Sequence, residues 1–325
     1  MGLLIDGVWF TENPNPKDGS GKFIRKDAAF RNCITKDGEA GPIGEGGFKA
    51  EAGRYHLYIS HACPWAHRTM IFRKLKGLED MISYSVVHHY MGEKGWGFQP
   101  GEGVIEDPIH GAEYVHQIYQ TAAANYSGRA SVPVLWDKER NTIVSNESSE
   151  IIRMFNSAFD DIGALPGDFY PKRFQDEIDV VNARIYETLN NGVYRSGFAT
   201  TQSAYENAVF PLFETLDWLE TRLSDQRYLV GGIITEADWR LFTTLVRFDP
   251  VYVGHFKCNL KRIVDYPNLS NYLRDLYQVA GVAETVNMDH IKSHYYGSHD
   301  TVNPTGVVPA GPIIDNMKPH DRGRF

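Results

Sequence analysis

The stretch Tyr55-His-Leu-Tyr-Ile-Ser-His-Ala-Cys-Pro-Trp-Ala-His-Arg68 decides how the first half of this 325-residue chain folds. Residues 55–60 alternate as in a β-strand, and an amphipathic helix is predicted from Pro64 to about Lys76. Residues 82–87, Ile-Ser-Tyr-Ser-Val-Val, predict a second strand. The stretch therefore begins a strand–helix–strand unit, with Cys63 where the first strand gives way to the helix.

The residues that follow extend this unit. A Gly-rich loop over 92–111 precedes a helix predicted at about 113–124, and strands over 132–136 and 142–145 flank a polar turn. A helix predicted at about 147–156 completes the order β-α-β-α-β-β-α. This is the order of a thioredoxin-like α/β fold, although other α/β arrangements share it.

The second half of the chain has a helical pattern. The Pro/Gly-rich stretch over 163–171 predicts a linker. Beyond it, periodicity predicts helices at about 173–190, 204–223, 236–247 and 269–278. Thr235 and Asp238 have the spacing of a capping box at the start of the third of these helices. We therefore predict an all-α C-terminal domain.

Five segments make up the predicted domain organisation. The first is an arm rich in Gly, Pro, Asn and Asp, which we expect to be extended and to lie on another part of the protein. The predicted boundaries are 1–53 for the arm, 54–160 for the thioredoxin-like domain, 161–172 for the linker, 173–296 for the helical domain and 297–325 for an irregular tail.

Composition excludes several classes of protein. The formal net charge of −8 disfavours nonspecific binding to nucleic acid, which depends on Lys and Arg. Cys33, Cys63 and Cys258 form no Cys-x-x-Cys pair, which argues against a disulfide framework and a structural zinc site. No stretch approaches the roughly 20 apolar residues of a membrane helix, and the first residues lack a secretory signal, so we expect a cytoplasmic protein without a membrane anchor.

Cys63 is the candidate nucleophile. Pro64 suits the first position of a helix, which places Cys63 at the N-cap, where free backbone N–H groups and the positive end of the helix dipole favour a thiolate. The alternative is an inert buried cysteine. Without a second cysteine three residues on, the resolving thiol must come from solution, and glutathione is the obvious candidate co-substrate.

Two further segments suit a peptide ligand. A cis Pro133 would leave the backbone of Val132 open to pair with an added strand; the alternative is an ordinary trans proline on an edge strand. Glu147 and Ser148, at a helix start, suit the charged α-amino-acid end of a γ-glutamyl peptide, although plain capping by Ser145 or Asn146 explains the same residues.

Arg129 could supply a cation for a carboxylate of the ligand in this acidic chain. A lone surface arginine is the alternative.

Taken together, these motifs resemble the glutathionyl-hydroquinone reductases, also called Xi-class glutathione transferases, which are relatives of the Omega-like enzymes. The resemblance covers nearly the whole chain. It is carried by Leu-Ile-Asp-Gly-Val-Trp9, Cys-Pro-Trp-Ala-His-Arg68, Gly95-Trp96, Ser127-Gly-Arg129, Val132-Pro133, Ile143-Val-Ser-Asn-Glu-Ser148, Asn190-Asn-Gly-Val-Tyr194, Arg247-Phe-Asp-Pro-Val-Tyr252, Asp289-His-Ile291 and His294-Tyr-Tyr296.

The resemblance implies a glutathione transferase architecture, a homodimer, and an activity. Cys63 would attack the glutathionyl sulfur of a glutathionyl-hydroquinone, and a second glutathione would release the resulting mixed disulfide as oxidised glutathione. Glutathione would be held by Trp96, Arg129, Val132, Glu147 and Ser148. Tyr194, Tyr252 and Tyr295 would line the acceptor site, with Tyr296 as the alternative to Tyr295.

Other functions remain open on the sequence alone. An Omega-like thioltransferase or dehydroascorbate reductase would share Cys63 but not need the tyrosines, and a noncatalytic glutathione-transferase-like module would need no thiol at all. The pairs Cys63/His67 and His290/His294 have the spacing of metal ligands on a helix. Neither has a recognisable third ligand, so we predict no metal.

Overall fold

The structure is a computed structural model that describes residues 2–11 and 19–325; residues 1 and 12–18 of the predicted arm lie outside the described residues. The chain divides into two compact units, each assembled from separate stretches of sequence. The first comprises Met1–Asn15, Lys26–Gly167 and Thr285–His294, and the second comprises Pro16–Arg25, Asp168–Glu284 and Tyr295–Phe325.

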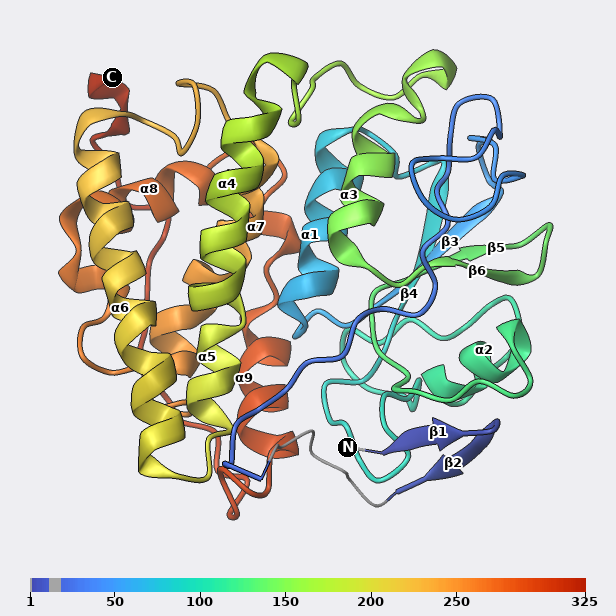
Figure 1. Cartoon of the computed structure of the whole chain (residues 1–325), viewed down its shortest axis with the longest axis horizontal. Helices are drawn as coiled ribbons and strands as arrows, with labels where there is room; N and C mark the ends of the chain where they lie inside the picture. Colours follow the sequence, from blue (N-terminus) through green and yellow to red (C-terminus); the bar gives the residue numbers. More distant parts are fainter. Residues whose placement is uncertain (1, 12–18) are drawn as a thin grey trace. The chain divides into compact units, whose positions relative to one another are not determined.

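The first unit is built on a four-stranded sheet in the order β4-β3-β5-β6 (Figure 1). Its strands are β3 (Tyr55–Ile59), β4 (Ile82–Val86), β5 (Val134–Asp137) and β6 (Thr142–Ser145). The central strand β3 runs parallel to β4 and antiparallel to β5, and all five of its residues are buried. A strand with neighbours on both sides and both faces covered is hydrophobic throughout, as β3 largely is.

Three helices accompany this sheet: α1 (Pro64–Leu75), α2 (Val115–Ala122) and α3 (Ser148–Ser157). Helices α1 and α3 lie side by side, and α2 lies apart from them (Figure 1). The predicted β-α-β-α-β-β-α order and thioredoxin-like fold are confirmed, with β5 beginning two residues later than predicted.

Residues 2–11 of the arm are joined to the rest of the first unit by backbone hydrogen bonds. Its hairpin, β1 (Leu3–Ile5) and β2 (Val8–Phe10), turns at Asp6-Gly7, where both residues have positive φ, 47° and 77°. Two-residue turns in which both residues have positive φ match the right-handed twist of the two strands that they connect. Leu4 and Gly128 exchange a pair of N–H···O bonds of 2.8 and 2.9 Å. The hairpin is thereby joined to the loop that precedes β5.

The second unit is helical, as predicted. Its helices are α4 (Gln175–Ile185), α5 (Gly192–Gly197), α6 (Gln202–Asp225), α7 (Glu236–Arg247) and α8 (Pro267–Tyr277), with π-helical turns at Tyr186–Asn190 and Phe248–Tyr252. Helix α9 (Met288–Ser298) crosses the boundary between the units along the chain. Single 3-10 turns occur at Asp160–Ile162, Lys172–Phe174, Ile263–Asp265, Ala283–Thr285 and Arg322–Arg324.

Three helical features differ from the prediction. The helix predicted over 173–190 is divided into a 3-10 turn, α4 and a π-turn, and α5 and α9 were not predicted. The buried residues of α9 are His290, Ile291, His294 and Tyr295. The spacing of these four positions is that of one face of a helix. Because two of these residues are histidines, a search for hydrophobic periodicity does not detect them.

The capping box at the start of α7 is confirmed. Asp238 Oδ2 accepts hydrogen bonds from Thr235 N at 2.7 Å and Thr235 Oγ1 at 3.0 Å. Its other oxygen, Oδ1, accepts from Leu229 N and the Tyr272 hydroxyl. The cap therefore also connects α7 to α8.

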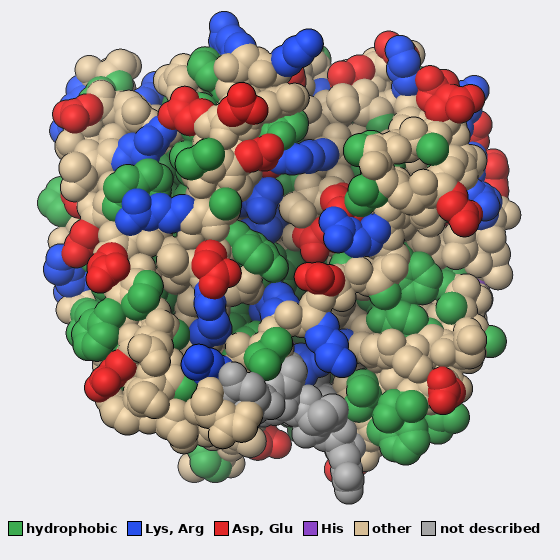
Figure 2. All heavy atoms as spheres, viewed as in Figure 1, with side chains coloured by type: hydrophobic (Ala, Val, Ile, Leu, Met, Phe, Trp, Pro, Cys, Tyr) green, Lys and Arg blue, Asp and Glu red, His purple; other side chains and the backbone are tan. Residues whose placement is uncertain are grey.

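Acidic and basic side chains are interspersed on the face shown in Figure 2. Within residues 2–11 and 19–325, no helix has the length and apolar character needed to cross a membrane.

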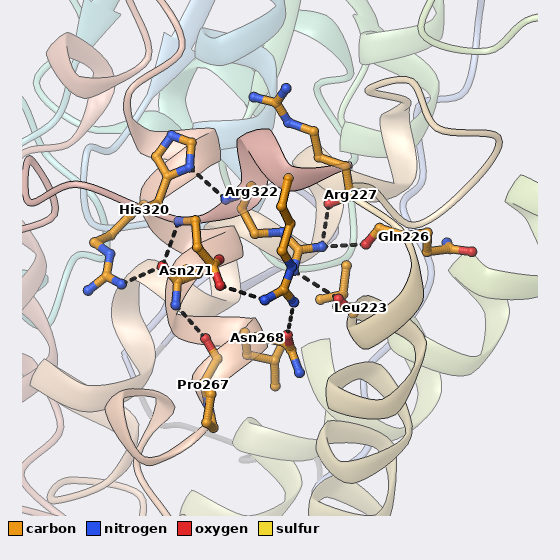
Figure 3. Close-up of polar contacts among 12 residues, drawn as sticks. Leu223, Gln226, Arg227, Pro267, Asn268, Asn271, His320 and Arg322 are labelled. Carbon is orange, nitrogen blue, oxygen red and sulfur yellow. Dashed lines mark hydrogen bonds and ion pairs between the residues drawn. The ribbon is translucent and has the colours of Figure 1, made fainter.

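Near the end of the C-terminal tail, the buried Arg322 caps α6 (Figure 3). The Arg322 side chain is fully buried, and it donates to the carbonyls of Leu223 at 2.8 Å, Arg227 at 3.0 Å and Gln226. The last carbonyls of a helix lack partners within the helix, and a cation near them is favoured by the helix dipole. The tail thus completes the end of the longest helix.

We expect Arg322→Met to lower the free energy of unfolding by about 2 kcal/mol, because charge-assisted hydrogen bonds to buried carbonyls are lost. Urea denaturation followed by circular dichroism measures this. Arg324→Met is the matched control, because Arg324 pairs with Asp321 on the surface, where such pairs contribute about 0–1 kcal/mol. Equal losses in the free energy of unfolding would show that the buried Arg322 contributes no more to stability than the surface Arg324.

Candidate active site and glutathione-binding loops

Cys63 is the N-cap of α1, as the sequence predicts. Its Sγ accepts a long hydrogen bond from Ala66 N at 3.5 Å and donates to the carbonyl of Val132 at 3.3 Å. Pro64 occupies the first turn, and Cys63 is partly exposed. Negative charge on this sulfur faces the backbone N–H groups and the positive end of the helix dipole, which stabilise it.

The other two cysteines lie in environments that suppress reactivity. Burial raises the pKa of the Cys258 thiol to about 12 and also raises the pKa of Cys33. Both side chains are buried, whereas Cys63 is accessible. Cys63 therefore has the geometry of a nucleophile.

The segment before β5 passes beside the sulfur. The Val132–Pro133 peptide bond is cis, the first of the two alternatives left open by the sequence, and Val132 lies two residues before the first residue of β5, Val134. The Val132 carbonyl is the acceptor of the Cys63 thiol. Val132 and Cys63, two of the predicted site residues, are thus neighbours.

Glu147, and not Ser145 or Asn146, is the N-cap of α3. Its Oε1 accepts from Ser149 N at 2.9 Å and from Ser149 Oγ at 2.8 Å. Capping by Asn146 does not occur because the Asn146 side chain is bonded elsewhere, to Phe30 N and the Tyr119 hydroxyl. A capping carboxylate still has further lone pairs that can accept from an ammonium group.

Ser148 follows at the first position of α3 and is 2% exposed. Its Oγ accepts a long hydrogen bond of 3.5 Å from Arg68, whose guanidinium also lies over the Trp65 ring at 4.5 Å. Arg68 belongs to the motif that begins at Cys63, but no role was predicted for it. An arginine on the buried side of a helix needs polar partners, and that signal could have assigned it.

Arg129 and Trp96 lie on loops that the arm contacts. Arg129 follows Gly128, which pairs with Leu4, and its carbonyl accepts from the Tyr126 hydroxyl at 3.2 Å. Trp96 is 8% exposed, and its ring lies 4.5 Å from that of His294.

The loop that carries Trp96 is held by Trp9 of the hairpin. Trp9 Nε1 donates to the carbonyl of Glu93 at 3.2 Å, and its ring stacks on His116 with the centroids 4.5 Å apart. His116 Nδ1 in turn lies 3.1 Å from the carbonyl of Lys94. Trp9 and His116 therefore bind the carbonyls of Glu93 and Lys94, the two residues immediately before Gly95-Trp96.

The three predicted acceptor-site tyrosines form a chain of hydroxyls in the second unit. The Tyr295 hydroxyl lies 2.6 Å from that of Tyr194 and 3.1 Å from that of Tyr252. Burial raises the pKa of Tyr252 and Tyr295 well above its usual range, so both remain protonated at neutral pH. The Tyr296 hydroxyl instead donates to the carbonyl of Pro250, so Tyr295 is the member of this cluster.

The histidines of the two candidate metal pairs have other partners. His67 Nε2 lies 2.8 Å from Thr285 Oγ1, and His294 Nδ1 lies 2.9 Å from the carbonyl of His89. Among the described residues, no three His, Cys, Asp or Glu side chains are grouped as metal ligands.

Comparison with known proteins identifies the family. The glutathione S-transferase N-terminal domain matches residues 62–158, and the C-terminal domain matches residues 202–275. The chain is 59% identical to glutathionyl-hydroquinone reductase PcpF of Sphingobium chlorophenolicum, with 96% of each chain covered. It is 58% identical to glutathionyl-hydroquinone reductase YqjG of Escherichia coli K12, with 99% of this chain and 98% of the relative covered.

Solved structures of related glutathione transferases point to the same family. The glutathione-bound structure of YqjG matches with a TM-score of 0.92 at 56% identity, covering 99% of this chain and 100% of the other. A Xi-class glutathione transferase from Natrialba magadii matches with a TM-score of 0.94 at 50% identity, covering 100% of this chain and 98% of the other. This chain belongs to the Xi-class glutathione transferases. The family resemblance inferred from the sequence is confirmed.

In this Xi-class chain, we expect a small thiol-alkylating reagent to label Cys63 at least about tenfold faster than the other two cysteines, because thiolate character and exposure both control the rate. Peptide mass spectrometry after brief exposure to iodoacetamide at pH 7 measures this. Labelling of Cys258 under native conditions would contradict the burial of that thiol.

Proposed function

We propose that the protein reduces glutathionyl-hydroquinones to hydroquinones at the expense of glutathione. The observation that carries this proposal is a single accessible thiol, Cys63, capping a helix in a chain that is 59% identical to a glutathionyl-hydroquinone reductase over nearly its whole length. A lone cysteine cannot resolve its own mixed disulfide, and free glutathione supplies the second thiol.

The proposed reaction has two steps. The Cys63 thiolate attacks the glutathionyl sulfur, an S–S bond forms, and the bond between that sulfur and the ring carbon breaks. The electron pair of the broken bond stays with the ring, which takes up a proton and leaves as the hydroquinone. The thiolate of a second glutathione then attacks the mixed disulfide, releases oxidised glutathione and regenerates the Cys63 thiolate.

Glutathione is placed, in this proposal, along the loops around Cys63. The Val132 backbone pairs with the peptide, and Glu147 and Ser148 at the start of α3 receive the γ-glutamyl end. Arg129 provides a cation for a carboxylate, and Trp96 packs against the ligand. Support comes from the position of Val132 beside the sulfur and from the glutathione-bound state of the related YqjG structure.

Tyr194, Tyr252 and Tyr295 are assigned to the hydroquinone. Phenol hydroxyls can hydrogen-bond the oxygens of the ring and relay a proton to it, because each hydroxyl both donates and accepts. Their connected hydroxyls support this role. We further propose that the protein is a homodimer, as the family resemblance implies, and that it is located in the cytoplasm.

We expect Cys63→Ala to abolish turnover, with a rate loss of about a thousandfold or more, while the protein stays folded. The assay incubates protein with a glutathionyl-hydroquinone and excess glutathione, and quantifies hydroquinone and oxidised glutathione by chromatography. Cys33→Ala is the matched control and should retain activity. Full activity of Cys63→Ala would refute the mechanism, and reduction of small mixed disulfides alone would favour a general thioltransferase.

We expect Tyr252→Phe and Tyr295→Phe to lower kcat/KM for a glutathionyl-hydroquinone by about tenfold, since a loss of about 1.4 kcal/mol in transition-state stabilisation has that effect. Reduction of the mixed disulfide of glutathione and 2-mercaptoethanol should change less than about twofold. Tyr296→Phe is the control, because its hydroxyl bonds the Pro250 carbonyl. Equal losses on both substrates would count against an acceptor-site role.

A further inference from the structure

A single buried hydroxyl connects the two loops that flank the proposed glutathione site. It belongs to Tyr119, which lies on α2 and is fully buried. The hydroxyl donates to the carbonyl of Ser131 at 2.9 Å and accepts from Asn146 Nδ2 at 3.0 Å. A third contact, from Ser131 N, measures 3.3 Å.

The three shorter contacts fill the one donor and two acceptor positions of a phenol, and Ser131 Oγ lies 3.5 Å from the same oxygen. Burial raises the pKa of Tyr119, so the hydroxyl keeps its proton at neutral pH and can donate to the Ser131 carbonyl. One oxygen atom therefore holds Ser131 from both its N–H and its C=O, and holds Asn146 as well.

The residues held by Tyr119 stand directly before the proposed ligand-binding residues. Ser131 precedes Val132, whose carbonyl accepts from the Cys63 thiol. Asn146 precedes Glu147, the N-cap of α3. Tyr119 therefore bridges these two backbone segments beyond Leu135 and Ser145, which are paired across β5 and β6.

Phe30 of the arm also binds Asn146, the residue that Tyr119 contacts at the start of α3. Phe30 and Asn146 are joined by two hydrogen bonds of 3.1 Å, from Phe30 N to Asn146 Oδ1 and from Asn146 N to the Phe30 carbonyl. The Phe30 ring packs on those of Tyr119 and Tyr126, with centroids 5.9 and 5.6 Å away. Because Oδ1 accepts from Phe30, the amide of Asn146 is oriented with Nδ2 toward Tyr119.

We propose that Tyr119 is a positioning residue for glutathione, acting through Asn146 and Ser131 to set the spacing between the Val132 backbone and the start of α3. This inference rests on the proposed placement of glutathione along these two segments. Tyr119 itself need not touch the ligand, and its effect is on binding rather than on the chemistry at sulfur.

The test is Tyr119→Phe, which keeps the ring and removes only the hydroxyl. We expect the KM and Kd for glutathione to rise about five- to tenfold, while kcat at saturating glutathione stays within about twofold. The alkylation rate of Cys63 should also stay within about twofold, because the cap of α1 is unchanged. A kcat loss without a change in KM would overturn the proposal.

Tyr55→Phe is the matched control for stability. Tyr55 is another fully buried tyrosine of the same unit, and its hydroxyl donates to the carbonyl of Lys49 at 2.6 Å. A merely structural role for Tyr119 predicts that both substitutions lower Tm alike and leave glutathione affinity unchanged. That result would overturn the proposal.

A double substitution tests the path through Asn146. If Tyr119 acts on the start of α3 through this amide, Asn146→Ala should weaken glutathione binding, and Tyr119→Phe added to it should weaken binding less than it does alone. Strictly additive effects would overturn the proposed path.

Calorimetric titration with glutathione separates this inference from the proposed reaction. The wild-type protein could bind glutathione and yet fail to reduce a glutathionyl-hydroquinone, which would refute the reaction and leave the role of Tyr119 testable by Kd alone.

Discussion

The antiparallel pairing of β3 with β5 determines where the sulfur of Cys63 lies. Tyr58 is paired with Val134, so the end of β3 and the beginning of β5 are at the same edge of the sheet. Cys63 follows β3 and Val132 precedes β5, which brings the thiol to the Val132 carbonyl. A shift of this register by one residue would turn the side chains of β3 to the opposite faces and displace that contact. The position of the Cys63 sulfur beside the Val132 carbonyl thus follows from the geometry of the sheet.

The sequence predicts β3, α1 and the start of α7 well because their signals are local. The alternation in β3, Pro64 at the first turn of α1 and the capping box of α7 all involve residues within a few positions of one another. Asp6-Gly7 between apolar residues is an equally local signal for the β1–β2 hairpin, although no hairpin was predicted there.

The remaining features depend on partners distant in the sequence. Asn146 is a good candidate for a helix cap, yet Phe30 and Tyr119 occupy its amide, and Glu147 caps α3 instead. Tyr295 could be selected only through family resemblance, because α9 buries histidines beside its apolar residues and shows no simple periodicity. Long-range hydrogen bonds of this kind leave no spacing rule in the sequence.

The arm supplies hydrogen-bond partners to the loops that carry the proposed glutathione-binding residues. Residues that bind ligands commonly lie on loops, whose backbone groups need partners outside regular structure. Here the arm supplies them at three places: Leu4 pairs with Gly128, Trp9 bonds the carbonyl of Glu93, and Phe30 pairs with Asn146. These contacts precede Arg129, Trp96 and Glu147 by one to three residues. In the proposed reaction, the loops must accept glutathione as part of the first substrate and then retain it as a mixed disulfide while a second glutathione attacks. A site that must keep its shape through both steps benefits from a fixed backbone, because affinity for the bound tripeptide is then not spent on ordering the loops again.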